Sequence, residues 1–349
     1  YDTKAYYLAG DLTLDKTLYI SGSGGNNVCI CLNGHSITQT GNYDVINVAN
    51  NVSLSLYDCS GVNAGQITHA SGATGRGVKF FAETRNTFDM YGGTITGNNA
   101  TDADDNMGGG VLVTGSGNGS FNLHGGVITG NSAANGGGVA VCSTQSNNKN
   151  TSRYFNMSGG TISDNQASDN GGGVYVENNG RVTVSGGEIK DNTATKGGGI
   201  GGGISGTNNG GSIDASTCPP IYITVSDRAK ITGNSAPVGG GIYAGDDAHG
   251  YCRFTMTGGE INGNTSGNTS VYNKNYTYNG GGVYLGGTMT VSGDAKIVNN
   301  TKDNESNNVF LPQVGDSTDY FTMTIGDDGL KSGASIGVTS SKALADGEA

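Results

Sequence analysis

The sequence predicts an all-β fold, a right-handed parallel β-helix with three short strands in each coil and about ten coils. Three observations predict it: an internal repeat, alternation of apolar and polar residues within each repeat, and an unusual glycine content. The 349 residues include 65 glycines, 4 prolines and no tryptophan. Such a composition does not suit an ordinary globular domain.

The repeat is visible in eight segments of the chain. FDMYGGTITGN begins at residue 88, FTMTGGEINGN begins at residue 254, and the last copy starts as FTMTIGDDG at 321. Consecutive copies start 27 to 41 residues apart, so a fixed core alternates with a loop of variable length. This pattern is typical of a solenoid.

The alternation of apolar and polar side chains predicts three short strands in each repeat. Phe254 and Met256 are apolar, whereas Thr255 and Thr257 are polar; an isoleucine flanked by polar residues follows, and then a GGGV run with an alternating tail. A single repeat cannot bury the apolar faces of three strands. Stacking of similar coils encloses those faces in one apolar interior.

The glycine runs, such as GGGVYV at 171–176, are expected at one corner of each coil. There the chain turns sharply and neighbouring backbones approach closely, which glycine permits. One asparagine recurs at an equivalent place in each coil, where stacked side-chain amides hydrogen-bond from coil to coil. These residues are Asn98, Asn131, Asn165, Asn192, Asn234 and Asn264.

We expect one β-helix domain over residues 1–338. Its first 87 residues form less regular coils, residues 88–338 form the repeat coils, and residues 339–349 form a polar C-terminal tail or linker. Stretches such as VCICLNGHSIT keep strand alternation in the less regular part.

Charge and composition exclude several classes of partner. The formal net charge is −11 and there is no basic run, which argues against binding to nucleic acid or to an anionic membrane. The sequence contains no stretch of eighteen apolar residues that would predict membrane insertion. Its opening, YDTKAYYLAGDLTL, does not have the pattern of a signal peptide, so we expect a mature or trimmed form of a longer protein. The six cysteines lack zinc-site spacing; disulfides and buried free thiols are equally consistent with them.

At the repeat motifs the chain resembles the glycine-rich β-helix domains of secreted and wall-attached surface proteins of Gram-positive gut bacteria. More loosely, it resembles the polymorphic outer-membrane protein repeats, although their FxxN and GGAI signatures do not occur here. The resemblance covers about 52–338, and LNGHSIT at 32–38 is similar to an opening coil. It implies a parallel β-helix and an adhesin-like role, while other parallel β-helices are lyases and glycosidases.

Two aspartates are the candidate catalytic residues. Asp164 and Asp191 replace, in consecutive coils, a glycine that most other coils carry at the same turn. Stacked one strand spacing apart, about 5 Å, two carboxylates have the separation that a retaining glycosidase uses, and they also suit Ca²⁺. The alternative is a pair of solvated turn aspartates.

The loop ATDADDNMGGG is the candidate calcium site, with Asp102, Asp104 and Asp105 as ligands. Hard oxygen ligands at close spacing suit Ca²⁺, but the EF-hand pattern is missing and a solvated acidic loop is the alternative. We expect no required cofactor, with Ca²⁺ as the only ion that the sequence suggests.

Tyrosines form the candidate ligand-binding patch. Exposed tyrosines beside Asn and Asp are suited to sugars, because rings cover apolar CH faces and polar side chains bond hydroxyls. The alternative is an outward tyrosine ladder that only stabilises the sheet. The patch comprises Tyr243, Tyr251, Tyr272, Tyr276, Tyr278 and Tyr284.

The leading hypothesis is a non-catalytic, extracellular, secreted or wall-attached adhesin-like module that binds host or microbial glycans or glycoproteins through corner loops. One alternative is a glycoside hydrolase or polysaccharide lyase on the same fold, and another is a passive surface stalk. In each case the chain is expected to be part of a longer multidomain surface protein.

Overall fold

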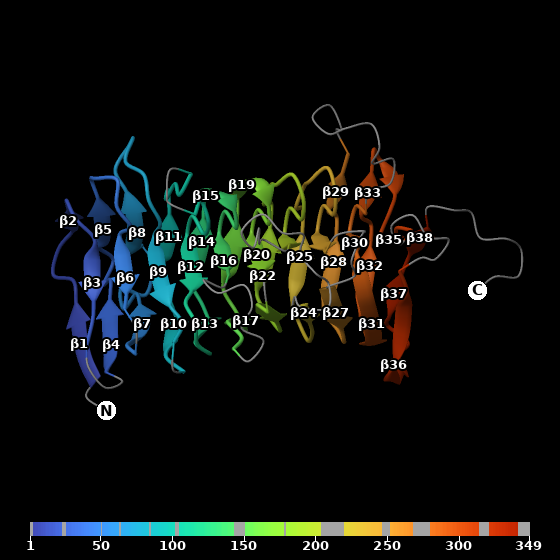
Figure 1. The fold of residues 1–349 in the computed structure, drawn as a ribbon, viewed down its shortest axis with the longest axis horizontal. Coiled ribbons are helices and arrows are strands. Elements are labelled where there is room, and N and C mark those ends of the chain that lie inside the picture. The colour runs from blue at the N-terminus through green and yellow to red at the C-terminus, as the bar shows by residue number, and fades with distance from the viewer. Residues whose placement is uncertain are drawn as a thin grey trace, which may run out of the picture.

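The computed structural model describes residues 3–22, 26–49, 51–62, 64–83, 85–101, 105–142, 151–177, 179–203, 220–245, 252–267, 280–313 and 321–340. The described chain is a right-handed parallel β-helix whose coils follow one another along the long axis (Figure 1). Three parallel sheets of eleven strands form its walls. The predicted fold class is therefore confirmed, with eleven coils where the repeats predicted about ten.

The first sheet contains the strand that opens each repeat. Its order is β1 (Thr3–Tyr7), β4 (Asn27–Cys31), β7 (Ser53–Tyr57), β10 (Thr87–Met90), β13 (Ser120–Leu123), β17 (Tyr154–Met157), β21 (Arg181–Val184), β24 (Ile221–Val225), β27 (Cys252–Met256), β31 (Gly287–Gly293) and β36 (Met323–Leu330).

The second sheet contains the isoleucine strand. Its order is β2 (Leu12–Leu14), β5 (Ser36–Gln39), β8 (Gln66–His69), β11 (Thr94–Thr96), β14 (Val127–Thr129), β18 (Thr161–Ser163), β22 (Glu188–Lys190), β25 (Lys230–Thr232), β28 (Glu260–Asn262), β32 (Lys296–Val298) and β37 (Ser335–Ile336).

The third sheet contains the strand that follows each glycine run. Its order is β3 (Leu18–Ile20), β6 (Ile46–Val48), β9 (Val78–Phe81), β12 (Val111–Thr114), β16 (Val139–Val141), β20 (Val174–Glu177), β23 (Ile200–Gly203), β26 (Ile242–Ala244), β30 (Val283–Leu285), β35 (Val309–Leu311) and β38 (Val338–Ser340).

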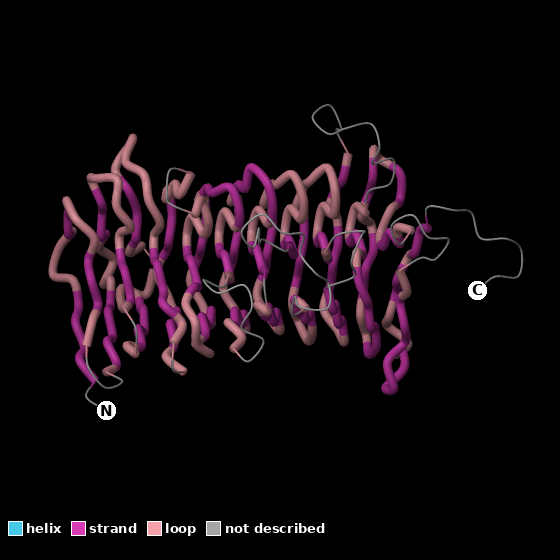
Figure 2. Tube along the Cα trace, viewed as in Figure 1, coloured by secondary structure: helices cyan, strands magenta, loops and turns pink. Residues whose placement is uncertain are grey.

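Short extra strands lie between the second and third strands of some coils (Figure 2). β15 (Ser132–Asn135) pairs with β19 (Gln166–Asn170), and β29 (Thr265–Ser266), β33 (Thr301–Lys302) and β34 (Glu305–Ser306) form a second small sheet. The coils therefore keep their register while the corner between these strands varies.

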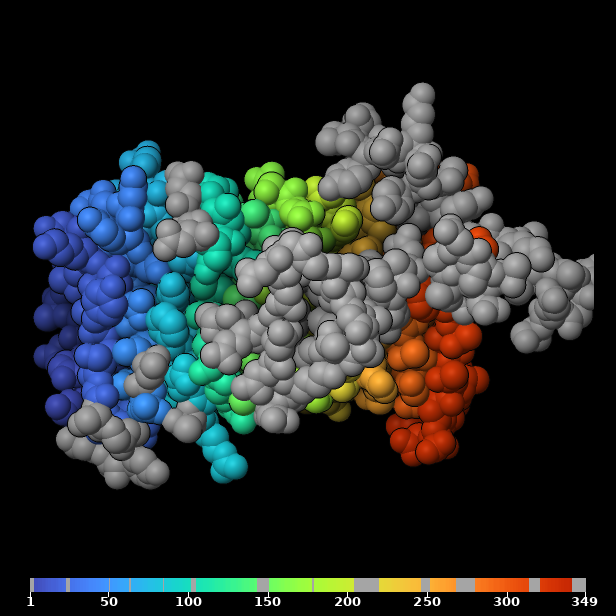
Figure 3. Space-filling model, in the orientation of Figure 1, coloured from blue at the N-terminus to red at the C-terminus, as the bar shows by residue number. Residues whose placement is uncertain are grey.

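The interior is a stack of matched apolar side chains. Phe88, Phe121 and Phe155 are fully buried, and their ring centroids lie 4.7 and 5.2 Å apart along the axis. Parallel pairing sets this repeat distance, because each residue faces its counterpart in the next coil. Burial of each such side chain contributes about 1.5–3 kcal/mol. In Figure 3 the colour runs along the long axis from the blue N-terminal end to the red C-terminal end.

The glycine runs lie at coil corners, as predicted. Gly171 has a φ of +67°, a backbone conformation that residues other than glycine rarely adopt. A Cβ at Gly172 would lie 2.5 Å from the Thr193 carbonyl oxygen of the next coil. Only glycine fits this close backbone approach.

The asparagine ladder is also confirmed, and it is longer than predicted. From Asn98 to Asn308, each Asn donates from Nδ2 to Oδ1 of the next Asn at 2.8–3.0 Å, and its backbone N–H donates to the same oxygen at every step. Asn300 and Asn308 extend the ladder toward the C-terminus. At the other end, Nδ1 of His69 lies 2.8 Å from Oδ1 of Asn98.

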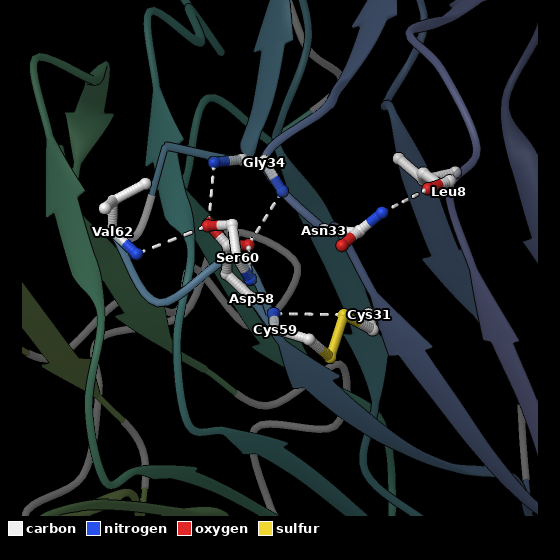
Figure 4. Close-up of a disulfide and its surroundings, with 9 residues drawn as sticks. Leu8, Cys31, Asn33, Gly34, Asp58, Cys59, Ser60 and Val62 are labelled. Carbon is white, nitrogen blue, oxygen red and sulfur yellow. Dashed lines mark hydrogen bonds between the residues drawn. A yellow bond between two sulfur atoms is a disulfide. The ribbon is translucent and has the colours of Figure 1, made fainter.

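A disulfide joins the second and third coils between Cys31 and Cys59 (Figure 4). Next to it, Asp58 accepts hydrogen bonds from the backbone N–H groups of Gly34, Ser60 and Gly65. Desolvation of the Asp58 carboxylate opposes ionisation, but these donors outweigh it and lower its pKa. Cys29, Cys142 and Cys252 are free thiols.

Candidate functional site

Tyr243 and Tyr284 lie in register on adjacent strands and point away from the interior, as the sequence predicted. Their predicted exposure is wrong: the two residues are 6% and 2% exposed. Their rings stack at 5.4 Å, and Tyr284 stacks in turn on Phe310 at 5.8 Å. Because the two rings stack on each other and pack with Val238 and Phe310, they belong to an apolar cluster separate from the interior and offer no open ring face to a ligand.

The other four tyrosines of the predicted patch, Tyr251, Tyr272, Tyr276 and Tyr278, lie outside the described residues. Their role in binding stays a prediction.

The predicted calcium loop is described only in part. Asp102 and Asp104 lie outside the described residues, and Asp105 forms an ion pair with Arg76. Among the residues that the structure describes, no three His, Cys, Asp or Glu side chains cluster as metal ligands would. Calcium binding therefore stays a prediction that rests on the sequence.

Asp164 and Asp191 occupy equivalent turns of neighbouring coils, as predicted. Ser163 pairs with Lys190, so the two aspartates that follow are one coil apart. Their φ values are +56° and +54°, close to the +66° of Gly97 at the same turn, and both residues are exposed. Aspartate is among the few residues that tolerate this conformation. The turn geometry by itself accounts for aspartate at these positions.

A row of exposed rings crosses the outer face of the first sheet. Tyr57 stacks on Tyr91 at 4.7 Å with an interplanar angle of 6°, and Tyr91 stacks on His124 at 4.7 Å. In this arrangement the ring faces cover one another and mainly ring edges meet the solvent. A sugar needs an open ring face, so this row is better suited to stabilising the sheet.

Open tyrosine rings occur instead at a groove beside the third sheet, near the N-terminal end. Tyr19 of β3 is 67% exposed and Tyr43, in the turn before β6, is 53% exposed. The groove between them has a volume of about 370 Å³, within the range of ligand pockets. We name it the Tyr19–Tyr43 groove. Its other lining residues are Thr17, Asn42, Asp44, Asn47, Thr74, Gly75, Arg76 and Lys79.

The turn that carries Tyr43 is fixed by hydrogen bonds to the next coil. The Thr74 N–H donates to Oδ1 of Asn42 at 3.1 Å, and the Arg76 N–H donates to Oδ1 of Asp44 at 3.0 Å. Nε2 of His69 lies 2.9 Å from the Tyr43 carbonyl oxygen. Three consecutive turn residues are thus held from outside the turn, which fixes the backbone at Tyr43 before any ligand binds.

The charges at the groove largely compensate each other. Arg76 is 3% exposed, and its guanidinium forms ion pairs with Asp44 and Asp105 while Nε donates to the Met107 carbonyl oxygen at 2.8 Å. Lys79 lies with Nζ 5.3 Å from the Phe81 ring centroid. The groove therefore presents amides, hydroxyls and two aromatic rings to solvent, a set suited to binding an uncharged polar ligand.

This groove was not predicted from the sequence. Tyr19 stands between Leu18 and Ile20, and alternation directs those two side chains inward. The outward direction of Tyr19 could therefore be predicted from the sequence. Tyr43 lies in a turn of the irregular coils, where no repeat gives the register. Only the pairing of β3 with β6 brings the two segments to one surface.

Comparison of the chain with protein-family profiles, curated proteins and solved structures found no significant match. None of the described segments forms a helix long and apolar enough to span a membrane.

Proposed function

We propose that this chain is a non-catalytic, adhesin-like β-helix module of a bacterial surface protein that binds host or microbial glycans or glycoproteins. The observation that carries the proposal is the Tyr19–Tyr43 groove, which combines two tyrosines that are more than half exposed with amide and hydroxyl groups on a backbone held by hydrogen bonds. Rings cover the apolar CH faces of a sugar, and the polar groups bond its hydroxyls.

Two further observations support an extracellular, secreted or wall-attached location. The Cys31–Cys59 disulfide is of the kind that persists in oxidising surroundings. The repeat motifs resemble those of wall-attached surface proteins. The proposal includes no nucleic-acid partner and no membrane insertion, in keeping with the net charge of −11, and places the module within a longer multidomain protein.

The test is to apply the purified protein, with and without Ca²⁺, to an array of mucin-type and plant-type glycans while recording both retained protein and released sugar. We expect retention without release. Tyr19→Ala and Tyr43→Ala should each weaken binding to a retained neutral glycan by at least about tenfold, equivalent to about 1.4 kcal/mol.

Tyr91→Ala is the matched control, because Tyr91 is 45% exposed but belongs to the stacked row on the first sheet. Its binding should equal that of the unmodified protein. Equal losses in all three variants would contradict a role for the groove. Released sugar would indicate the enzymatic alternative, and absence of any retention would favour a passive stalk.

A further inference from the structure

A second outer surface, on the first sheet, has a different chemistry from the groove. Over β17, β21, β24 and β27 the parallel register aligns Tyr154, Arg181, Tyr222 and Arg253 in one outward row. Two residues further along each of the last three strands, a parallel row holds the hydroxyls of Thr183, Thr224 and Thr255. We name these two rows the arginine–tyrosine face.

The guanidinium of Arg181 is held in place on this face. Its Cζ lies 3.8 Å from the ring centroid of Tyr222, and its Nε donates to Oγ of Ser152 at 3.3 Å. A guanidinium stacked in this way stays charged and keeps its remaining N–H groups available for a planar anion. Arg181 is therefore oriented before a ligand arrives.

The cations on this face lack an acidic partner in the part of the chain that the structure describes. The ion pairs there involve Arg76, Lys190, His35 and His124, and neither Arg181 nor Arg253. No Asp or Glu occurs in either row; the adjoining acid, Asp227, follows Ser226 in a turn beside Arg228. Among the seven residues of the two rows, the charged groups are the guanidinium groups of Arg181 and Arg253.

The spacing of the two arginines matches an extended ligand. Arg181 and Arg253 are two coils apart, since each pairs with Tyr222 between them, which is about 9.6 Å at the usual strand spacing. Two linked sugar rings in an extended polysaccharide have a comparable length. An anionic group on every second sugar would therefore meet one arginine after the other, while the threonine hydroxyls face the sugar hydroxyls between them.

We infer that the arginine–tyrosine face binds the carboxylate or sulfate groups of an extended acidic polysaccharide. This inference rests on the proposed function in taking the ligand to be a glycan, but it concerns a separate surface. The contact is bidentate and charge-assisted at each arginine, which makes it both specific for planar or tetrahedral oxyanions and sensitive to salt.

The test compares the binding of heparin and of polygalacturonate, as sulfated and carboxylated probes, with the binding of a neutral glycan retained on the array. The double variant Arg181→Gln/Arg253→Gln should bind the acidic probe that the unmodified protein prefers at least about tenfold more weakly, with less dependence on salt. Arg253→Gln alone should show part of this loss, and because Arg253 is exposed this variant should fold normally.

Lys230→Gln/Lys296→Gln is the charge-matched control, since both lysines are exposed on the second sheet. An equal loss in this control would overturn the inference by showing a non-specific charge effect. Unchanged acidic-probe binding in the arginine variants, failure of the unmodified protein to bind either probe, or tighter binding of single-stranded DNA would overturn it as well.

The two proposals fail separately in this design. Tyr19→Ala/Tyr43→Ala should lose the neutral glycan and keep the acidic probe, whereas the arginine variants should do the reverse. Loss of both ligands in either set would contradict two independent surfaces.

Discussion

Substitution of one asparagine in the ladder is expected to destabilise the β-helix far more than its size suggests. Asn192 is fully buried, and its side chain takes part in four hydrogen bonds. Nδ2 donates to the Ile162 carbonyl oxygen at 3.0 Å and to Oδ1 of Asn234 at 2.9 Å; Oδ1 accepts from the backbone N–H and from Nδ2 of Asn165.

Asn192→Ala would leave the buried Asn165 N–H without a partner, whereas the Ile162 carbonyl oxygen would keep the ladder hydrogen bond from the Lys190 N–H that comes with the pairing of Ile162 and Ile189. Nδ2 of Asn165 would keep its bond to the Ile128 carbonyl oxygen, and Oδ1 of Asn234 would keep the Asn192 N–H. An orphaned buried N–H costs about 1–3 kcal/mol, so the free energy of unfolding should fall by about 1–3 kcal/mol.

The measurement is urea denaturation followed by circular dichroism, together with hydrogen exchange at the Asn165 amide. Asn156→Ala is the control, because its Nδ2 donates to Asn122 at 2.9 Å on the partly exposed outer face. That variant should lose less than about 1 kcal/mol, since water replaces the lost partner. Equal destabilisation of the two variants, or an unchanged exchange rate at Asn165, would refute the reasoning.

Three further predictions follow from the corners, the turns and a buried thiol. Gly172→Ala should lower the free energy of unfolding in urea by about 3 kcal/mol because of its clash with the Thr193 carbonyl, whereas Gly263→Ala, with nothing within 4 Å of its added Cβ, should lose only about 1–2 kcal/mol for its left-handed φ. Asp164→Gly should change stability by less than about 0.5 kcal/mol in the same assay, because other coils carry glycine at this turn; a loss of several kcal/mol would assign the carboxylate a structural role beyond the turn. Burial raises the pKa of the Cys142 thiol from 9.0 to about 12, so the folded state favours the protonated thiol. The stability that this preference contributes is fully present below pH 9. It is lost as the pH rises toward 12, and the loss is about 4 kcal/mol at most. Denaturation of Cys142→Ala across this range should show a shallower fall in stability than the unmodified protein, and parallel curves would contradict the shift.

The fold was predictable because a similar pattern of strand and corner residues occurs in successive repeats. Alternation in FTMT and its counterparts directs Phe254 and Met256 inward, and the stacking of like coils then fixes their neighbours. The asparagine ladder followed from one residue type at one place in each copy. Its extension to Asn308 was not predictable, because Asn308 comes only eight residues after Asn300 and breaks the period.

The surface chemistry was less predictable, because alternation gives the direction of a side chain and not what covers it. Tyr243 and Tyr284 point outward as expected, yet they are buried against each other and against Phe310. Tyr19 and Tyr43 lie in coils where the period is weak, so no alignment of repeats brings them together. The pairing of Cys31 with Cys59 likewise depends on the register of β4 with β7.

The residue-for-residue register that the second sheet keeps between coils of unequal length makes one coil the unit by which this protein can grow or shrink. The repeats differ by up to 14 residues in length, yet Ile162, Ile189 and Ile231 still pair residue for residue. Duplication or deletion of a whole coil would preserve every wall of the helix. Such an event between β9 and β17 would slide the Tyr19–Tyr43 groove and the arginine–tyrosine face past each other by one strand spacing, about 4.8 Å, and leave the chemistry of both unchanged.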